Sequence, residues 1–448
     1  MRPPRLHFIA RLSWTGKWLF IASLVAVLAG TASAFFLFAL EAATVWRVGH
    51  PAIIWLLPLA GFGVGWVYHR WGRPVDAGNN LLIDQIHDPT AVVPLRMAPL
   101  VLGGTVISHL FGASVGREGT AVQMGGALAD QLTRVLRLTP EDRRVLLMAG
   151  ISAGFASVFG TPLAGAIFGL EVLAIGHVRH RALFPCLVAA IVADRVGMAW
   201  GVHHTHYAVG AITPLGLWSV FAVAVAGVAF GLVGRVFSTA THALGRLVRR
   251  FVGYPPLRPV LGGVVIAGAV WALGAAQFDA HKYLGLGIPT VVQAFEVPVA
   301  PWDFLGKLLF TVASLGTGFK GGEVTPLFYI GATLGNALAP LLHLPFSMLA
   351  GIGLVAVFAG AANTPLATIV MAMELFGPGI GPLAAVACVV SYLCSGHTGI
   401  YQSQRLGRSK YAYRWPADLR LGELEHRRNE SAEASRHPDG KGDKDKSS

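Results

Sequence analysis

The chain has 448 residues, of which 54% are apolar and only 13% charged, and its formal net charge is +12. Soluble domains usually carry about 25% charged residues, so this chain has too little charge to cover itself against water. The composition therefore excludes an ordinary soluble domain and predicts a protein that lies in lipid.

Long uncharged apolar runs recur along the chain. A helix needs about 20 apolar residues to span the hydrocarbon core, and several runs reach or nearly reach that length. Shorter apolar runs add further candidates. We therefore predict an all-α polytopic membrane protein with more than ten membrane segments, some of them too short to cross fully. The long runs are residues 18–40, 145–170, 211–234, 259–278, 324–342 and 375–396, and the shorter ones include 51–68 and 97–108.

Basic residues stand at the N-terminus and in short connectors. Arg2, Arg5, Arg11 and Lys17 precede the first apolar run, which is too long for a signal peptide and lacks a small-x-small exit. This pattern predicts a multi-pass protein of the cell membrane with cytoplasmic termini. Between apolar segments, basic connectors indicate topology and contact with anionic lipid rather than with nucleic acid. The connectors are 134–144, 177–181, 246–258 and 405–420.

Two blocks of sequence occur twice. TPLAGAIFGLE at 161–171 aligns with TPLATIVMAME 203 positions later, and GREGTAVQMGGALA at 116–129 aligns with GGEVTPLFYIGATL 205 positions later. Chance is the alternative, but the shared Glu and Thr at matching places argue against it. Internal repeats are common in transporters, where substrate binds near the midplane between broken helices of the two halves.

The repeats suggest the domain limits. We predict a membrane transport domain over residues 1–413, composed of two repeats at approximately 18–200 and 211–402. The remaining residues, 414–448, are polar and rich in both signs of charge, which predicts a disordered cytoplasmic tail.

The segment Gly116–Thr120 reads GREGT and stands directly before an apolar run. Glycines leave backbone N–H groups open and the helix adds the positive end of its dipole, which is typical of an anion site. The Glu118 carboxylate can occupy this site itself, or leave it when protonated. Helix capping or pairing with a base is the structural alternative, although Arg117 is adjacent in sequence and adjacent helical residues do not face each other. Ionisable residues in membrane segments are functional by default.

The second copy, GFKGGEVTP, ends at Pro326. Proline there suits the first turn of another helix that begins inside the membrane. Thr325 offers a hydroxyl donor, and Lys320 either pairs with Glu323 or attracts anions. The alternative is a capped helix with Thr325 as its N-cap.

With these motifs, the chain resembles the CLC family of chloride channels and anion/proton antiporters over nearly the whole membrane domain. GREG followed by the TPLAG…E block is a specific combination. The resemblance implies a homodimer of all-helical subunits, each with its own ion pathway and two inverted-topology halves of broken and tilted helices. It implies fluoride or chloride, protons and membrane lipid as partners, and no cofactor.

Three positions depart from the chloride-transporting pattern. Asn79 replaces the ion-binding serine, and Gly322–Pro326 lacks the phenylalanine of Gly-x-Phe-x-Pro. Glu171 is followed by Val172, where proton-coupled chloride members carry a second glutamate for internal proton transfer. The usual proton route is therefore in doubt.

Together these departures resemble the fluoride-exporting branch of the family, which also uses GGEVTP. That resemblance makes Glu118 the gating and proton-coupling glutamate of a fluoride/proton antiporter, and Tyr401 the central tyrosine. A chloride/proton antiporter or passive chloride channel is the close alternative. Tyr401 follows the last apolar run, so an anchor at the membrane interface is its alternative role. The other predicted pathway residues are Asn79, Gly116, Arg117, Gly119, Glu323, Val324 and Thr325.

Other signals are weaker. Ser114 and Ser152 stand in G-x-S-x-G matches that could suggest an intramembrane hydrolase, but no base or acid accompanies them and helix packing explains the glycines. His203, His204 and His206 indicate a solvated loop rather than a metal site, so we predict no metal. The equivalent residues Glu171 and Glu374 are interpreted as buried structural carboxylates.

Overall fold

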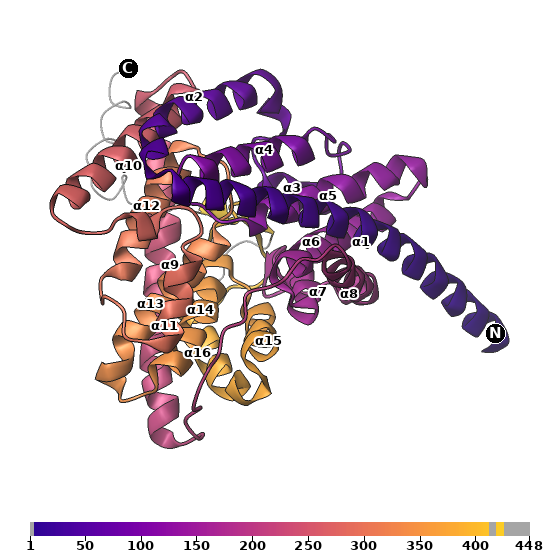
Figure 1. The fold of residues 1–448 in the computed structure, drawn as a ribbon. Helices are drawn as coiled ribbons and strands as arrows, with labels where there is room; N and C mark the ends of the chain where they lie inside the picture. Colours follow the sequence, from indigo (N-terminus) through magenta and orange to yellow (C-terminus); the bar gives the residue numbers. More distant parts are fainter. Residues whose placement is uncertain (1–3, 412–417, 425–448) are drawn as a thin grey trace, which may run out of the picture.

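The computed structural model describes residues 4–411 and 418–424, which form an almost entirely helical protein (Figure 1). Short turns of 3-10 or π helix join some of the longer helices. The helices of the first half are α1 (Pro4–Gly49), α2 (Leu57–Val67), α3 (Asn79–His87), α4 (Met97–Leu110), α5 (Glu118–Val135), α6 (Pro140–Phe159), α7 (Pro162–Glu171) and α8 (Leu183–Ala199). Those of the second half are α9 (Leu217–Phe251), α10 (Leu257–Ala275), α11 (Ile288–Glu296), α12 (Asp303–Thr317), α13 (Val324–Leu342), α14 (Phe346–Ala362), α15 (Pro365–Phe376) and α16 (Gly381–Cys394). The short turns are η1 (Pro51–Leu56), η2 (Tyr68–Gly72), η3 (Arg73–Val75), η4 (His180–Ala182), η5 (His281–Tyr283) and η6 (Pro378–Ile380).

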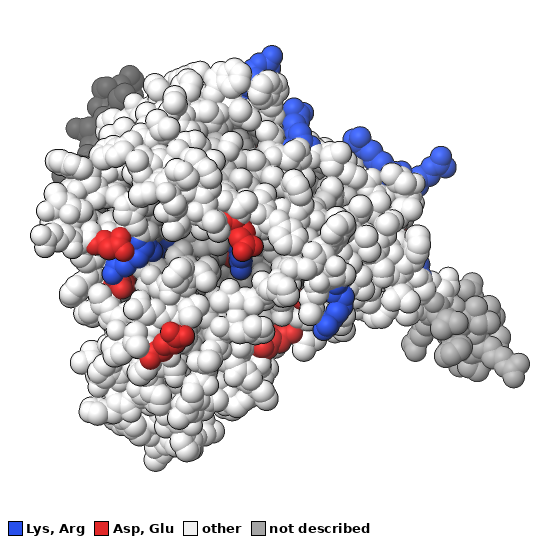
Figure 2. All heavy atoms as spheres, viewed as in Figure 1, with Lys and Arg blue, Asp and Glu red and all other residues white. Residues whose placement is uncertain are grey.

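The surface is suited to lipid. Six helical segments are long and apolar enough to cross a membrane, and shorter apolar helices accompany them. Large apolar side chains point outward, including Phe20 at 67%, Leu59 at 68% and Trp271 at 64% exposure. Figure 2 shows a face that is almost free of charge, with a few Lys, Arg, Asp and Glu side chains scattered over it. These features confirm the predicted all-α membrane protein with some helices too short to span.

The two halves have equivalent arrangements. Helices α5, α6 and α8 pack around α1, and α13, α14 and α16 pack around α9 (Figure 1). The pairs α5–α6 and α13–α14 are in backbone contact, because a β-carbon at Gly125 would overlap the Gly150 carbonyl and one at Gly331 would overlap the Gly353 carbonyl. Small residues permit such close approach of membrane helices.

Glu171 and Glu374 each cap the start of a helix in the other half of the protein. The Glu171 carboxylate accepts hydrogen bonds from Leu366 N (3.0 Å) and Ala367 N (2.8 Å), at the start of α15. The Glu374 carboxylate accepts from Leu163 N (2.9 Å) and Ala164 N (2.8 Å), at the start of α7. Each carboxylate satisfies N–H groups that a helix start leaves unpaired and lies at the positive end of its dipole. Both carboxylates are structural, as interpreted, but only Glu171 is buried, because Glu374 is partly exposed.

A small sheet corrects the predicted start of the tail at residue 414. Strand β1 (Ala174–Ile175) pairs in parallel with β2 (Arg405–Leu406), which pairs in antiparallel with β3 (Leu419–Arg420). Leu419, Leu421 and Leu424 are buried against Ile175 and Leu406. Three leucines at a spacing of two and three residues are enough to bury this segment. The prediction of disorder rested on the many charged residues around them and gave these leucines no weight. The rest of the predicted tail, 425–448, lies outside the described residues.

Lys410 provides a pH-dependent element of stability. Its ammonium donates to Asn363 Oδ1 (2.5 Å), to the Tyr392 carbonyl (2.7 Å) and to Ser395 Oγ (3.1 Å). Burial lowers the pKa of Lys410 to about 7. Because the unfolded chain then binds more protons than the folded protein between about pH 7 and the ordinary lysine pKa of about 10.4, stability rises with pH across that window.

We therefore expect the unfolding temperature of the purified protein in detergent to rise by about 2 °C or more between pH 7.5 and 9.5. Lys410→Met removes the titrating group and flattens this rise. Lys17→Met, at a partly exposed lysine paired with Asp142, serves as the control and keeps it. Equal slopes in the two variants would show that Lys410 does not titrate in this range.

Candidate functional site

The two predicted glycine segments meet in space although they lie more than 200 positions apart. Gly116 N donates to the Gly322 carbonyl (2.6 Å), and Gly322 N donates to the Gly116 carbonyl (2.8 Å). Helix α5 begins at Glu118 and α13 begins at Val324. The bridge therefore brings the positive ends of two helices to one point inside the protein.

The Glu118 carboxylate occupies that point. Its Oε2 accepts hydrogen bonds from Thr325 N (3.0 Å) and Arg117 N (3.1 Å), and its Oε1 accepts one from Thr325 Oγ1. The side chain is 1% exposed. The donors that hold the carboxylate are of the kind that would hold a small anion, so the site already contains an anion of the protein itself. While the carboxylate holds these donors, they are not open to a second anion.

Two basic side chains differ from expectation. Arg117 is the N-cap of α5 rather than part of the helix, so its Nε lies 3.7 Å from Glu118 Oε1 despite the adjacent sequence positions. Lys320 does not pair with Glu323: its ammonium binds Asp76 Oδ1 at 2.6 Å and lies 4.1 Å from the centre of the Tyr68 ring. Arg117 is thus the cation at the site, and the alternative that pairs Lys320 with Glu323 is wrong.

Asn79 and Glu323 flank Gly119. A β-carbon built on Gly119 would lie 3.1 Å from Asn79 Nδ2 and 3.7 Å from Glu323 Oε2. Asn79 Oδ1 and Glu323 Oε2 are buried and have no hydrogen-bond partner among the described residues. Val324 is buried in the first turn of α13. The N-cap of α13 is Glu323, so the alternative of Thr325 as N-cap is wrong and its hydroxyl is available to the site.

Tyr401 is buried rather than anchored at the membrane interface. It is 4% exposed, and its ring packs edge-on to Phe168 with centroids 6.4 Å apart. Phe168 in turn stacks on Phe155 at 4.2 Å, and Phe155 faces Phe358 at 6.3 Å. No motif in the sequence predicted this cluster of rings. The signal was present, since Phe155 and Phe358 stand just before the two TPLA blocks of the repeat.

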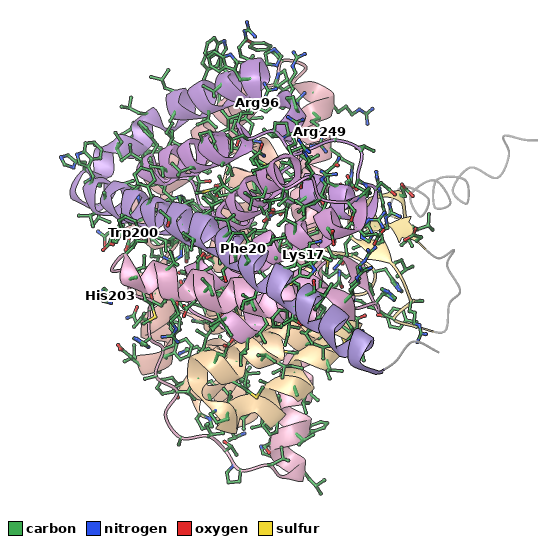
Figure 3. The ribbon with its side chains drawn as sticks, turned by 90° about the vertical axis from the view of Figure 1, so that its right-hand side faces the viewer. Lys17, Phe20, Arg96, Trp200, His203 and Arg249 are labelled. Carbon is green, nitrogen blue, oxygen red and sulfur yellow. The ribbon has the colours of Figure 1, made fainter. Side chains whose placement is uncertain are left out.

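The loop between α8 and α9 carries the three histidines. His203 and His206 are exposed, and Figure 3 shows His203 near Trp200 at one edge of the molecule. His204 is instead only 16% exposed, with Nε2 at 3.7 Å from Asp194 Oδ1. Burial lowers the pKa of His204, and the Asp194 carboxylate opposes that shift. Within residues 4–411 and 418–424, no group of three His, Cys, Asp or Glu side chains is placed to hold a metal ion.

The serines of the hydrolase alternative are both buried: Ser114 lies in the segment between α4 and α5, and Ser152 lies within α6. Ser114 Oγ shares a hydrogen bond with Thr311 Oγ1 (2.9 Å) rather than with a general base. Ser152 is completely buried, and a β-carbon at Gly169 would overlap its hydroxyl. Ser152 therefore serves close helix packing, and Ser114 ties the segment before α5 to α12.

Comparison with known proteins agrees with this geometry. The sequence profile described as voltage gated chloride channel matches residues 60–396. The chloride/fluoride channel protein of Pseudomonas syringae pv. tomato is 70% identical over 434 residues, which cover 96% of this chain and 95% of that one. The H(+)/Cl(-) exchange transporter ClcA of Cronobacter sakazakii is 26% identical, over 80% and 81% of the two chains.

Solved structures of CLC-type transporters also match this fold. The crystal structure of a CLC-type fluoride/proton antiporter matches with a TM-score of 0.83 and 34% identity, over 87% of this chain and 98% of that one. A slow cyanobacterial Cl-/H+ antiporter matches with a TM-score of 0.73 at 22% identity, which shows a shared fold.

Proposed function

The chain belongs to the voltage-gated chloride channel (CLC) family, and on that premise we propose that it exports fluoride in exchange for protons. A CLC-type anion/proton antiporter in a membrane is the coarser assignment, which the family supports. One observation carries the proposal: the Glu118 carboxylate lies on the Thr325 donors at the junction of two helix starts. A protonatable group and the carried anion compete there for the same donors.

This competition couples the two fluxes. When Glu118 is protonated it loses its negative charge, binds these N–H and hydroxyl donors less strongly, and leaves them to an incoming anion. When it is deprotonated it displaces the anion, so each occupant excludes the other. The internal glutamate of chloride/proton members has no counterpart, because buried Val172 occupies its position and its carbonyl accepts from Gln404 Nε2 (3.1 Å). Protons must therefore reach Glu118 by a route that does not use a carboxylate at position 172.

The available donors favour fluoride. Fluoride holds its water more strongly than chloride, so a site that strips it must offer strong donors. Thr325 offers a hydroxyl and a backbone N–H, and the Asn79 amide, next to Gly119, donates to none of the described residues. Two similar proteins, one named a chloride/fluoride channel protein and the other a CLC-type fluoride/proton antiporter, agree with this preference.

Thr325→Val tests the donor argument. Valine keeps the shape of threonine but removes the hydroxyl, and a hydrogen bond to a charged group contributes about 1.5–3 kcal/mol. We expect fluoride efflux from proteoliposomes to fall about tenfold or more relative to chloride efflux. Thr239→Val, at an exposed position of α9 whose hydroxyl binds only the Arg235 carbonyl, should leave the ratio unchanged. An unaltered ratio in Thr325→Val would refute the role of the hydroxyl.

A chloride/proton antiporter or a passive chloride channel is the second candidate. The 26% identity to a chloride exchanger favours the antiporter, and the 70% identity to a protein named a chloride/fluoride channel favours the channel. Proteoliposomes loaded with fluoride or with chloride, with internal pH followed, separate the three activities. Fluoride-driven proton uptake that chloride does not match is expected. Equal chloride-driven uptake, or fluoride release without protons, would contradict the proposal.

We also propose a homodimer with cytoplasmic termini, as the resemblance implied. Exposed apolar side chains at equivalent positions of the repeat, Leu163 on α7 and Leu366 on α15, offer a surface that a second copy could cover. Light scattering of the purified protein, corrected for detergent, is expected to give twice the chain mass.

A further inference from the structure

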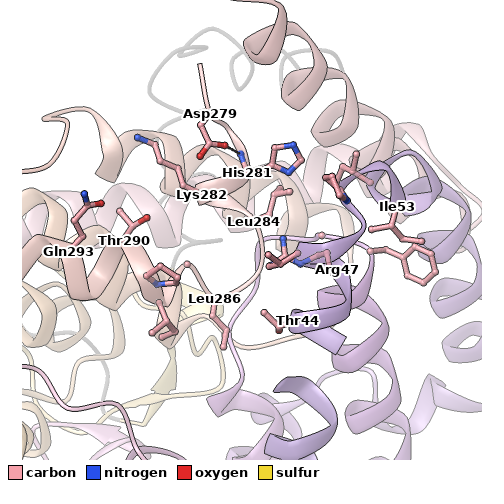
Figure 4. Close-up of a pocket in the computed structure, with 18 residues that line it drawn as sticks. Thr44, Arg47, Ile53, Asp279, His281, Lys282, Leu284, Leu286, Thr290 and Gln293 are labelled. Atoms are coloured by element: carbon pink, nitrogen blue, oxygen red, sulfur yellow. Dashed lines mark hydrogen bonds between the residues drawn. The ribbon is translucent and has the colours of Figure 1, made fainter. Parts of the chain in front are cut away.

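A cavity of about 660 Å³ lies between the end of α1, turn η1 and the start of α11 (Figure 4). None of its lining residues belongs to the candidate anion site. Ligand pockets of proteins typically have volumes of about 300–1,000 Å³, so this one is large enough for a molecule of moderate size. Its wall combines cationic and apolar side chains.

Arg47, in the last turn of α1, supplies the cationic part. Its side chain makes no hydrogen bond or ion pair with any described residue, and its Nε is buried. The other cations nearby are satisfied: Lys282 binds Asp303 Oδ1 (2.6 Å), and Lys307, beneath the 283–285 loop, donates to the carbonyls of Tyr283 (3.0 Å) and Gly285 (2.6 Å). A partly buried guanidinium without an acceptor is costly, so it favours an anion.

The carboxylate in the wall does not pair with Arg47. Asp279, the carboxylate in the wall, accepts a hydrogen bond from His281 N (2.9 Å), as the dashed line in Figure 4 shows. The start of α11, around Gly287 and Ile288, also lines the cavity and adds the positive end of a helix dipole. The cavity is therefore suited to a negative group placed at Arg47.

Next to Arg47, the wall is suited to hydrocarbon. Aliphatic and aromatic side chains line it, and two tryptophans outside it, Trp46 and Trp55, are 46% and 55% exposed. Exposed tryptophans of this kind mark the level of lipid headgroups in membrane proteins. A ligand that fits both parts has a compact anionic group joined to an apolar chain. The apolar lining residues are Val48, Ile53, Ile54, Phe111, Leu284 and Leu286.

We propose that this cavity binds the phosphate group of an anionic phospholipid, with Arg47 as its principal contact and an acyl chain along the apolar wall. Basic pockets between membrane helices recognise lipid headgroups by the same chemistry. A bidentate Arg–phosphate contact would satisfy the guanidinium that the protein leaves unpaired.

The bound lipid would also support the transport site. Gly112 lines the cavity, and Gly285 N, in the loop that forms its floor, donates to the Ala113 carbonyl (3.2 Å). Ala113 lies three positions before Gly116, and Ser114 N is held by Ser314 Oγ (2.9 Å). A lipid that orders the 284–287 loop therefore orders the segment that leads to Glu118.

Native mass spectrometry of the full-length purified protein tests the proposal. After incubation with equimolar phosphatidylglycerol and phosphatidylcholine, we expect the protein to retain phosphatidylglycerol preferentially. Arg47→Gln should reduce that retention about tenfold, whereas Arg47→Lys should keep part of it because the charge remains. Arg195→Gln, at a 69% exposed arginine near the end of α8, is the matched control and should bind as the unmodified protein does.

A second variant and a second ligand complete the test. Ile53→Trp fills the apolar wall without touching the charge and should also reduce retention, so the result does not depend on the folding of one variant. Inorganic phosphate at the same concentration should not displace the lipid. Retention that is equal in the unmodified protein, Arg47→Gln and Ile53→Trp would overturn the proposal, and displacement by inorganic phosphate would show that the site takes a free anion instead.

Discussion

Replacing Glu118 with glutamine is expected to abolish fluoride-driven proton movement. Glutamine has nearly the shape of protonated glutamate but takes up no proton at neutral pH. In addition, the Glu118 carboxylate faces only donors, namely the N–H groups of Arg117 and Thr325 and the Thr325 hydroxyl. The amide would turn its own NH₂ toward one of them, so the side chain can no longer satisfy the site as an internal anion.

The measurement is internal pH in proteoliposomes under a fluoride gradient. Proton uptake in Glu118→Gln should fall to the rate of protein-free liposomes, while any remaining fluoride flux becomes independent of the pH gradient. Glu296→Gln, at an exposed glutamate that ends α11, controls for the loss of one carboxylate and should transport normally. Normal coupling in Glu118→Gln would remove this glutamate from the mechanism.

The sequence predicted the parts of the site that are local. Glycines before an apolar run predict a helix start with open N–H groups, and this holds for both Gly116–Thr120 and Gly321–Thr325. The repeat and the apolar runs predicted the fold class, because lipid leaves the backbone few alternatives to helices. The repeat also indicated a shared structural role for Glu171 and Glu374, because they occupy equivalent positions in its two copies.

What depends on contacts between distant segments could not be predicted. Pairing with its neighbour Glu323 was one of two alternatives for Lys320, but its partner in the fold is Asp76, 244 positions away. The burial of Tyr401 depends on Phe168 in the other half of the chain. The phospholipid cavity combines α1 with the loop before α11, and no motif marks it. Spacing along the chain carries no information about such pairs until the two halves are packed.

Gly322→Ala tests another long-range contact, the close approach of Gly322 to the first turn of α5. A β-carbon at position 322 would lie 2.7 Å from Gly119 N and 3.3 Å from Glu118 N. Both atoms belong to the backbone of a helix start, so neither can move aside as a flexible side chain would. The variant must separate the first turns of α5 and α13, and with them Thr325 from Glu118.

We therefore expect Gly322→Ala to lose transport of fluoride and protons together, by at least about tenfold, since overpacking costs typically 1–3 kcal/mol and each 1.4 kcal/mol is a factor of ten. Gly268→Ala, on α10, is the matched control, because a β-carbon there meets no atom within 4 Å and alanine favours the helix. A folded Gly322→Ala protein, eluting as the unmodified one does, would localise the defect to the site. If that variant transports at the unmodified rate, the close approach of Gly116 and Gly322 is not what positions Glu118 on its donors.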